Sequence, residues 1–243
     1  MSDFNYPSQI GKYKVVTLSG ADWKQHRTAR LDISVGQPYH EGEKFLATIE
    51  WAKHRFSSVI VSVADSLQRY NIAFQEKISL EEAENIALKN GDEWIERHAP
   101  FIRSLPEFEI TRWNQWLEHP GFSEKLHSIQ EFYVNNRCFA DCINANITSI
   151  WERKVGSHPA FIPDYFDEFA AFSRKYLLEE TAAFGLIFKE RQAVDIYPGS
   201  LLFMWDFLEE QGAPEALSSL KNGYFTRIDF RRNRNAQELR MAS

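Results

Sequence analysis

The stretch RLDISVGQPYHEGEKFLATIEWAKHRFSSVIVSVAD, residues 30–65, decides the fold. Residues 29–34 predict a short strand, and residues 35–43, which contain two glycines and a proline, predict a loop. A helix is expected over 43–56, because apolar side chains recur there on one face: Phe45, Ile49, Ala52 and Phe56. A β-branched run then gives a second strand that ends at Asp65. This order predicts a βαβ unit, and therefore a parallel sheet with a right-handed crossover.

Outside this unit the pattern is mainly helical. Ser79, with Glu82 three positions later, predicts the capped start of a helix that runs to residue 104. Further helices are expected over most of 108–154 with a break at Pro120-Gly121, from Pro163-Asp164 onward, and around 201–210. Strands are expected over 191–198 and, as an edge strand, over 223–230. Since no repeat or linker divides the chain, we expect one α/β domain over residues 1–243, with a Rossmann-like parallel sheet flanked by helices.

The composition is that of an ordinary globular protein. The 243 residues carry 28 Lys and Arg against 34 Asp and Glu, and 44% of them are apolar. The net charge of −6 argues against broad, non-specific nucleic-acid binding, but it leaves room for a local basic patch. No secretory signal is visible, and the apolar run 201–205 is far below the ~20 residues of a membrane span, so a cytoplasmic protein is expected. Cys138 and Cys142 are expected to be core thiols, with no disulfide framework and no metal site.

Ser34 is the first candidate for chemistry. It ends a strand, so its hydroxyl can be exposed while the amides of Val35 and Gly36 stabilise an oxyanion. The alternative is that Ser34 only helps to form the turn. The loop that follows is no phosphate cradle, because a phosphate loop needs Lys and Ser or Thr after its second glycine, and Gly42 is followed by Glu43.

Tyr176 and Glu180 are the second candidate pair. They lie four positions apart and continue an apolar helix face through Phe169 and Ser173. A carboxylate on such a face needs a partner, which is either a cationic ligand group or an internal Lys or Arg. Tyr197, at a strand end, is ambiguous between packing and function.

Taken together and in this order, these residues resemble the cyclodipeptide synthases. The resemblance rests on a serine in an aliphatic-S-x-G context after the first strand, on Y-x-x-x-E in a late helix, and on Y-P at a late strand end. Gln37, three positions after the serine, together with Tyr197-Pro198, is similar to the XYP subgroup of that family. The segment W-A-x-x-R-F at 51–56 also agrees, and the resemblance covers residues 30–200.

The resemblance implies a fold similar to the catalytic domain of class Ic (tyrosyl and tryptophanyl) aminoacyl-tRNA synthetases. It implies no ATP and no cofactor, and two aminoacyl-tRNAs as substrates of an aminoacyltransferase that makes a 2,5-diketopiperazine. Ser34 would form aminoacyl- and dipeptidyl-enzyme intermediates in ping-pong order. Glu180 and Tyr176 would hold the substrate ammonium, Tyr197 would relay a proton, and Pro198 would shape its loop.

Further residues are expected to bind substrate. Gly36 and Gln37 follow the serine, and Arg30 and Asp32 alternate with it on one side of the strand. Arg30 is predicted to pair with an acidic amino acid; the alternative is an internal Arg30–Asp32 pair.

The better-known subgroup of cyclodipeptide synthases binds tRNA through a helix that is dense in arginine. The tRNA-binding surface of this chain is expected to differ. Residues 80–103 here offer few cations among many acids. Candidate tRNA-binding residues are Lys53, Arg55, Lys89, Arg97, Arg231, Arg232 and Arg234. The alternative is that the C-terminal arginines form a solvated tail and that the others are surface charge.

Three other functions remain open from the sequence. One is an aminoacyl or peptidyl transferase that passes the acyl group to an external amine. A second is a non-catalytic, synthetase-like module that binds tRNA. A serine hydrolase is the third, although G-x-S-x-G and a placed histidine are absent.

Overall fold

The computed structural model describes residues 12–156, 159–190, 192–199, 207–208 and 210–233. Its centre is a six-stranded sheet with the order β1-β6-β5-β2-β3-β4. The neighbouring strands are parallel, except that β1 runs antiparallel to β6. The strands are β1 Tyr13–Gly20, β2 Thr28–Ile33, β3 Ser58–Val63, β4 Phe108–Arg112, β5 Val194–Tyr197 and β6 Tyr224–Arg232.

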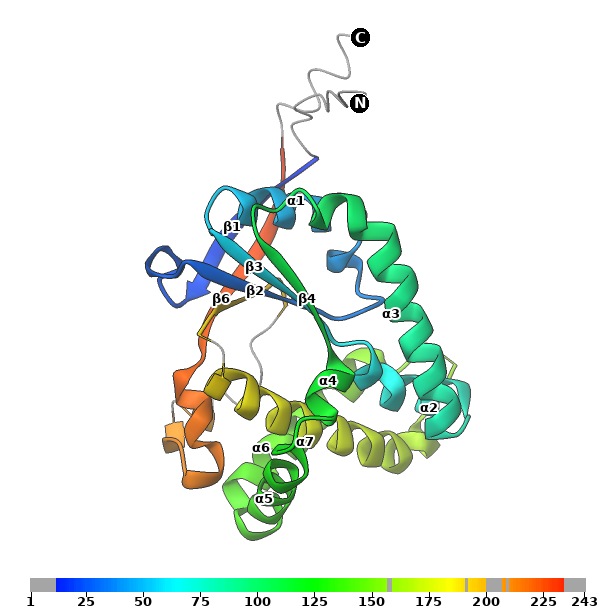
Figure 1. Ribbon diagram of the computed structural model, residues 1–243. Helices are drawn as coiled ribbons and strands as arrows, with labels where there is room; N and C mark the ends of the chain where they lie inside the picture. The colour runs from blue at the N-terminus through cyan, green and yellow to red at the C-terminus, as the bar shows by residue number, and fades with distance from the viewer. Residues whose placement is uncertain (1–11, 157–158, 191, 200–206, 209, 234–243) are drawn as a thin grey trace.

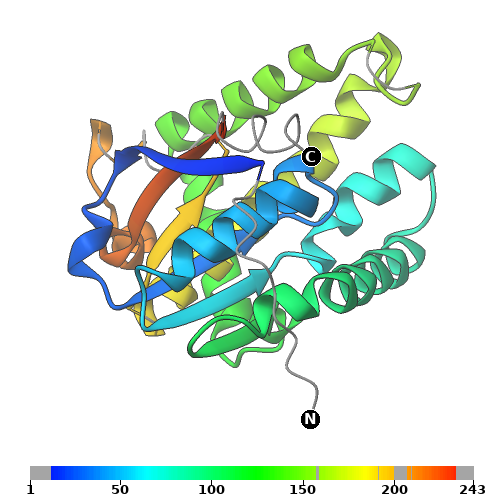
Figure 2. The same cartoon turned by 90° about the horizontal axis from the view of Figure 1, so that it is seen from above.

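Helices cover both faces of this sheet (Figure 1, and from above in Figure 2). The α-helices are α1 Gly42–Lys53, α2 Arg69–Glu76, α3 Leu80–Ile102, α4 Trp113–Leu117, α5 Phe122–Asn135, α6 Arg137–Lys154 and α7 Phe166–Glu190. Short 3-10 turns are η1 Trp23–Gln25, η2 Pro38–His40, η3 Ser66–Gln68, η4 Pro163–Tyr165 and η5 Glu215–Asn222. One apolar core joins the sheet to α1 and α3, and a second joins α2, α4, α5, α6, α7 and η5.

The predicted βαβ unit is confirmed as β2, α1 and β3. Ala29 pairs with Val59 and Ile33 with Val63 in parallel register. The helical stripe faces the sheet core, where Phe45, Ile49 and Ala52 are fully buried. The unit forms because β-branched strands buried on both faces need a helix to cross over between them.

The start of α3 is also confirmed. Ser79 accepts a hydrogen bond from the Glu82 amide at 3.2 Å, and the Glu82 carboxylate accepts one from the Ser79 amide at 3.0 Å. This reciprocal cap satisfies two backbone donors that the helix itself leaves free.

Replacing Gly91 with alanine is expected to destabilise the fold by about 1–3 kcal/mol. Gly91 lies inside α3, and a Cβ there would lie 2.7 Å from the Asp65 Cβ and 3.0 Å from an Arg112 nitrogen. Asp65 is fully buried and bonded to Arg112 at 2.6 Å, so it has no room to move. Chemical denaturation measures the loss. Gly121→Ala is the control, because its nearest side-chain atom would lie 3.4 Å away, and an equal loss in both variants would contradict the prediction.

Several expectations were wrong. Residues 108–112 form β4 rather than helix, and β1 was not anticipated. Because β1 pairs with β6, β6 is an inner strand and not an edge strand. The prediction of a core thiol was wrong for Cys138, which is exposed on α6, whereas Cys142 is partly buried and packs against the core. Of the helix expected around 201–210, residues 201–206 and 209 lie outside the described residues.

The parallel strands β2, β3 and β5 end at the same edge of the sheet. Ser34 follows β2, Ala64 follows β3, and Tyr197 ends β5. In open α/β sheets ligands bind beyond the carboxyl ends of the strands, so this edge is where a site is expected. Among the helices that the structure describes, none has the length and apolarity to cross a bilayer.

Candidate active site

A cavity of about 220 Å³ opens at this edge. Its lining includes all four residues predicted to be catalytic: Ser34, Tyr176, Glu180 and Tyr197. They come from β2, α7 and β5, so the fold brings together residues up to 163 positions apart. Apolar rings from Trp113, Phe184 and Phe225 line the cavity together with the polar side chains of Asp32, Ser62 and Asn146.

The Ser34 hydroxyl belongs to a chain of three hydroxyl groups. Its Oγ lies 3.1 Å from the Tyr197 hydroxyl, which lies 2.8 Å from the Tyr39 hydroxyl. Burial raises the pKa of Tyr197 and that of Tyr39, so both phenols keep their protons at neutral pH. Such a chain can pass a proton to and from the serine without forming a free charge.

His40 fixes the loop that carries the serine. The Ser34 amide donates a hydrogen bond to His40 Nδ1 at 2.9 Å, and the Trp94 indole donates to the His40 carbonyl at 3.0 Å. Burial lowers the pKa of His40 to about 3, which keeps the imidazole neutral and able to accept. His40 therefore orients the backbone of Ser34 and is not placed to act as its general base.

The amides after Ser34 are available to a ligand. The Gln37 amide donates to the Ser34 carbonyl at 3.2 Å and closes a tight turn. Gly36 has a φ of +86°, a conformation that glycine adopts without strain. Within the described residues, the Val35 and Gly36 amides have no acceptor. They remain the candidates for stabilising an oxyanion at this turn.

Glu179 and Glu180 are consecutive on α7 but have different surroundings. Glu179 is buried and accepts from Arg69 at 2.9 Å, from Tyr70 at 2.8 Å and from Trp113 at 3.0 Å. Glu180 faces the cavity, and no residue that the structure describes donates a hydrogen bond to it or forms an ion pair with it. The sequence left open an internal Lys or Arg as the partner of Glu180. In the structure Arg69 pairs with Glu179 and not with Glu180.

The surroundings of Glu180 raise its pKa to about 8, first through burial and then through the charge of Glu179. Tyr176, one turn earlier, accepts a hydrogen bond from Gln68 at 3.4 Å. Burial and the nearby Glu180 carboxylate raise the pKa of Tyr176 well above its ordinary value. A cationic group that entered the cavity would find an unpaired carboxylate and a neutral phenol side by side.

Arg30, which was predicted to bind an acidic substrate side chain, does not line the cavity. Its guanidinium is buried, 2.5 Å from Asp195 and 3.4 Å from Asp32, and 5.1 Å from the centre of the Phe188 ring. The alternative of an internal Arg30–Asp32 pair is present, with Asp195 as the closer partner. Asp32 does line the cavity, and burial together with the charge of Asp195 raises its pKa well above the ordinary value.

The remaining candidates lie elsewhere. Gly36 and Gln37 line a neighbouring hollow, and Pro198 follows β5, partly buried. Arg97 lines the same hollow as Gln37 and pairs with Glu41 at 3.3 Å. The other candidates for tRNA binding lie on separate elements: Lys53 on α1, Arg55 just after it, Lys89 on α3, and Arg231 and Arg232 on β6. Arg234 lies outside the described residues.

Sequence reasoning missed four residues of this site: Tyr39, His40, Glu179 and Asp195. The segment Pro38-Tyr39-His40 was assigned to the loop only, although an aromatic and a histidine near a candidate nucleophile are a signal. In the part of the chain that the structure describes, no group of three His, Cys, Asp or Glu could hold a metal ion.

Solved structures of known proteins are similar to this chain over most of its length. No family model matches the sequence, and no curated protein does. The structure of a cyclodipeptide synthase from Fluoribacter dumoffii matches with a TM-score of 0.79 and 26% identity, over 91% of this chain and 100% of that one. A cyclodipeptide synthase from Candidatus Glomeribacter gigasporarum, solved with Phe-tRNAPhe bound, matches with a TM-score of 0.64 and 18% identity, over 85% and 87% of the two chains.

A Mycobacterium tuberculosis protein, whose structure is described as demonstrating that cyclodipeptide synthetases are related to type I tRNA synthetases, matches with a TM-score of 0.66. It shares 13% identity over 90% of this chain and 94% of that one. The chain thus has the synthetase-like α/β fold that these structures share. The resemblance to the cyclodipeptide synthases found in the sequence is confirmed by this similarity of structure. The place of the chain in the XYP subgroup stays a prediction.

Proposed function

We propose that the protein joins the aminoacyl groups of two aminoacyl-tRNAs into a 2,5-diketopiperazine by ping-pong catalysis through Ser34. The observation that carries this proposal is the shared cavity: its lining includes Ser34, which is hydrogen-bonded to the Tyr197 hydroxyl, and the Glu180 carboxylate, which has no partner among the described residues. The related structure with Phe-tRNAPhe bound supports aminoacyl-tRNA as the substrate.

In the first step the Ser34 Oγ attacks the ester carbonyl of one aminoacyl-tRNA. A bond forms between Oγ and the carbonyl carbon, the bond from that carbon to the ribose oxygen breaks, and the serine proton passes to the ribose oxygen through Tyr197. The Val35 and Gly36 amides stabilise the tetrahedral oxyanion. Because an aminoacyl ester is already activated, the neutral hydroxyl chain suffices and no histidine base is required.

In the second step the α-amine of the seryl ester attacks the ester of a second aminoacyl-tRNA, which releases that tRNA and leaves a dipeptidyl-enzyme. The free amine of the dipeptide then attacks the seryl ester. A nitrogen–carbon bond forms, the carbon–Oγ bond breaks, and a proton returns to Oγ along the Tyr197–Tyr39 chain. Each turnover regenerates the serine.

Glu180 and Tyr176 position the amine. The unpaired carboxylate holds the substrate ammonium and fixes the ester against Ser34, which converts binding into proximity. With a pKa of about 8, Glu180 is also suited to take the proton that the ammonium must lose before it attacks.

Replacing Ser34 with alanine is expected to lower diketopiperazine formation on the order of 10³-fold or more, because no other nucleophile takes over. Purified protein is mixed with tRNA charged with all twenty amino acids, and products and protein adducts are measured by mass spectrometry. The wild type should show an aminoacyl adduct on Ser34. Ser123→Ala, on the exposed side of α5, is the matched control and should leave both signals unchanged.

Three results would contradict the proposal. Formation of diketopiperazine by the Ser34→Ala variant would rule out a seryl intermediate. An adduct on Ser34 that is passed only to an added external amine would indicate a linear acyl transferase. Binding of tRNA with neither adduct nor product would indicate a non-catalytic module.

A further inference from the structure

Asp32 is a buried carboxyl group of the catalytic cavity that the proposed mechanism does not use. Its side chain lines the cavity, is 15% exposed, and lies two residues before Ser34, on the same side of the strand. Ser62 is paired with Asp32 in the register of β3 with β2, and its side chain also lines the cavity. A rise of about 3.3 Å per strand residue places this polar pair roughly 6–7 Å from Ser34 along the strand.

The hydrogen bonds of Asp195 indicate the protonation state of Asp32. Asp195 Oδ1 pairs with Arg30 at 2.5 Å, whereas Asp195 Oδ2 is buried and has no donor among the described residues. A hydrogen bond joins the Asp32 and Asp195 side chains, and two carboxyl groups form such a bond only when one of them is protonated. A proton on Asp32 therefore supplies the missing donor, and it leaves the other Asp32 oxygen free to accept a hydrogen bond.

The charges around Asp32 also favour its neutral form. Arg30 faces both acids, Asp195 at 2.5 Å and Asp32 at 3.4 Å, so one cation is shared by two carboxyl groups. Burial raises the pKa of Asp32 well above its ordinary value. Asp195 and Glu180 raise it further, and Arg30 opposes the rise. Arg153, a cation in the lining, is exposed on α6 and pairs with no carboxylate that the structure describes.

We propose that Asp32 and Ser62 select an aminoacyl group with a carboxamide side chain, that of glutamine or asparagine, for transfer to Ser34. The inference rests on the proposed function and names the class of its first substrate. The Asp32 carbonyl oxygen accepts a hydrogen bond from the substrate amide. The Ser62 hydroxyl, which has no partner among the described residues, donates one to the substrate carbonyl.

Other side chains match these two groups less well. An apolar side chain leaves the Asp32 oxygen and the Ser62 hydroxyl unpaired, and unpaired polar groups of a site are what reject an isostere. A carboxylate would face two acids, Asp32 and Glu180. A cationic side chain would displace the proton from Asp32 and leave Asp195 Oδ2 again without a donor. A serine or alanine side chain is too short for a separation of roughly 6–7 Å.

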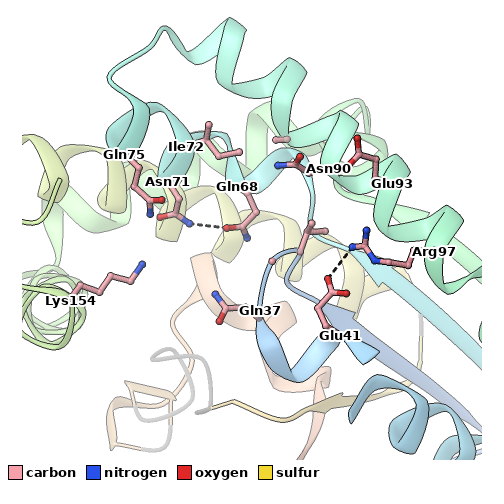
Figure 3. Close-up of a pocket in the computed structure, with 13 residues that line it drawn as sticks. Gln37, Glu41, Gln68, Asn71, Ile72, Gln75, Asn90, Glu93, Arg97 and Lys154 are labelled. Atoms are coloured by element: carbon pink, nitrogen blue, oxygen red, sulfur yellow. Dashed lines mark hydrogen bonds and ion pairs between the residues drawn. The ribbon is translucent and has the colours of Figure 1, made fainter. Parts of the chain in front are cut away.

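The neighbouring hollow is not an alternative place for this side chain. It lies beside the loop after β2, and its labelled residues include Gln37, Gln68 and Asn71 (Figure 3). Neither Ser34 nor Tyr197 is among the described residues that line it. An acyl group bonded to the Ser34 Oγ therefore has its side chain in the catalytic cavity, where the two polar groups lie.

Binding of amide-linked analogues tests the inference without any acyl transfer. The probes are 3′-amino-3′-deoxyadenosine acylated with glutamine, asparagine, methionine, glutamate or lysine, and calorimetry at neutral pH gives their affinities. Methionine is similar to glutamine in length but lacks its hydrogen-bonding groups. The wild type should bind a carboxamide probe about tenfold or more tightly than the methionyl, glutamyl and lysyl probes, because two hydrogen bonds distinguish them.

Substitutions at Asp32 separate a neutral acid from a carboxylate. Asp32→Asn should keep the preference, because its amide can donate to Asp195 Oδ2 while its carbonyl accepts from the substrate. Asp32→Leu should abolish the preference. Ser62→Ala, which leaves Asp195 untouched, should weaken carboxamide binding about threefold to tenfold and carries the test if Asp32→Leu does not fold. Asp141→Asn, at an exposed aspartate on α6, is the matched control, and melting curves verify that each variant is folded.

The absence of a carboxamide preference in the wild type, or its loss in Asp32→Asn, would overturn the inference. Tightest binding of the lysyl probe would show that Asp32 acts as a carboxylate, and it would overturn the inference as well. The Ser34 adduct tests the proposed function separately. A carboxamide preference without any Ser34 adduct would keep the assigned class of ligand and refute the seryl mechanism, whereas an adduct without this preference would do the reverse.

Discussion

Glutamine in place of Glu180 is expected to lower diketopiperazine formation by two or more orders of magnitude and, at the same time, to stabilise the fold at alkaline pH. Activity falls because an amide cannot neutralise the substrate ammonium or accept its proton. Stability rises because the amide removes a buried carboxylate that has no partner in the part of the chain that the structure describes. Sites built for a charged ligand commonly carry this conflict between function and stability.

The pH dependence of this gain has a definite sign. The pKa of Glu180 is about 8 in the folded protein and about 4.3 in an unfolded chain. The folded state thus binds the proton more tightly, so Glu180 costs stability progressively as pH rises from about 4.3 to about 8. Glu180→Gln should match the wild type near pH 4 and exceed it above pH 8 by a few kcal/mol, since each pKa unit is about 1.4 kcal/mol.

Denaturation curves at several pH values measure this difference. Glu179→Gln is the matched control: it changes the adjacent carboxylate, which is paired with Arg69, and should be destabilising. A Glu180→Gln variant that is less stable than wild type at pH 9, or that keeps full activity, would show that Glu180 has a structural partner.

Replacing Arg30 with leucine is expected to destabilise the fold by about 3–5 kcal/mol. Arg30 is 1% exposed, and its removal takes away the cation that Asp195 and Asp32 share among the described residues. Burial raises the pKa of both aspartates and Arg30 opposes that rise, so without Arg30 they retain their protons to still higher pH. The loss should therefore be smaller near pH 5, where the carboxyls are neutral, and larger near pH 8.

Thermal and chemical denaturation of Arg30→Leu across this pH range provide the measurement. Arg30→Lys is the control, because it keeps one positive charge and should lose less. A loss that does not depend on pH, or one of equal size in both variants, would mean that packing against Phe188 and not the charge holds this region together.

The local parts of the fold were predictable from the sequence. The βαβ unit, the cap of α3 and the inward face of Tyr176 and Glu180 depend on residues a few positions apart, so periodicity and capping chemistry are enough. The resemblance to the cyclodipeptide synthases also implied that Ser34, Tyr176, Glu180 and Tyr197 share a site, and all four line one cavity.

The errors concern pairings between distant segments. Asp195 lies opposite Arg30 in the register of β5 against β2, and nothing near Arg30 in the sequence shows that neighbour. The prediction of β6 as an edge strand was wrong because its partner, β1, comes more than 200 residues earlier in the chain. β4 was read as helix because its five residues show no clear alternation, with Phe108 exposed at its start.

The three hydrogen bonds that hold Glu179 also orient the neighbouring Glu180 carboxylate. Consecutive residues of an α-helix point about 100° apart, so the angle at which Glu180 enters the cavity depends on how α7 is rotated about its axis. Arg69, Tyr70 and Trp113 hold Glu179 from α2 and α4, and they fix that rotation. The direction in which the Glu180 carboxylate points into the cavity is therefore set by three side chains of other helices, which act on it through Glu179.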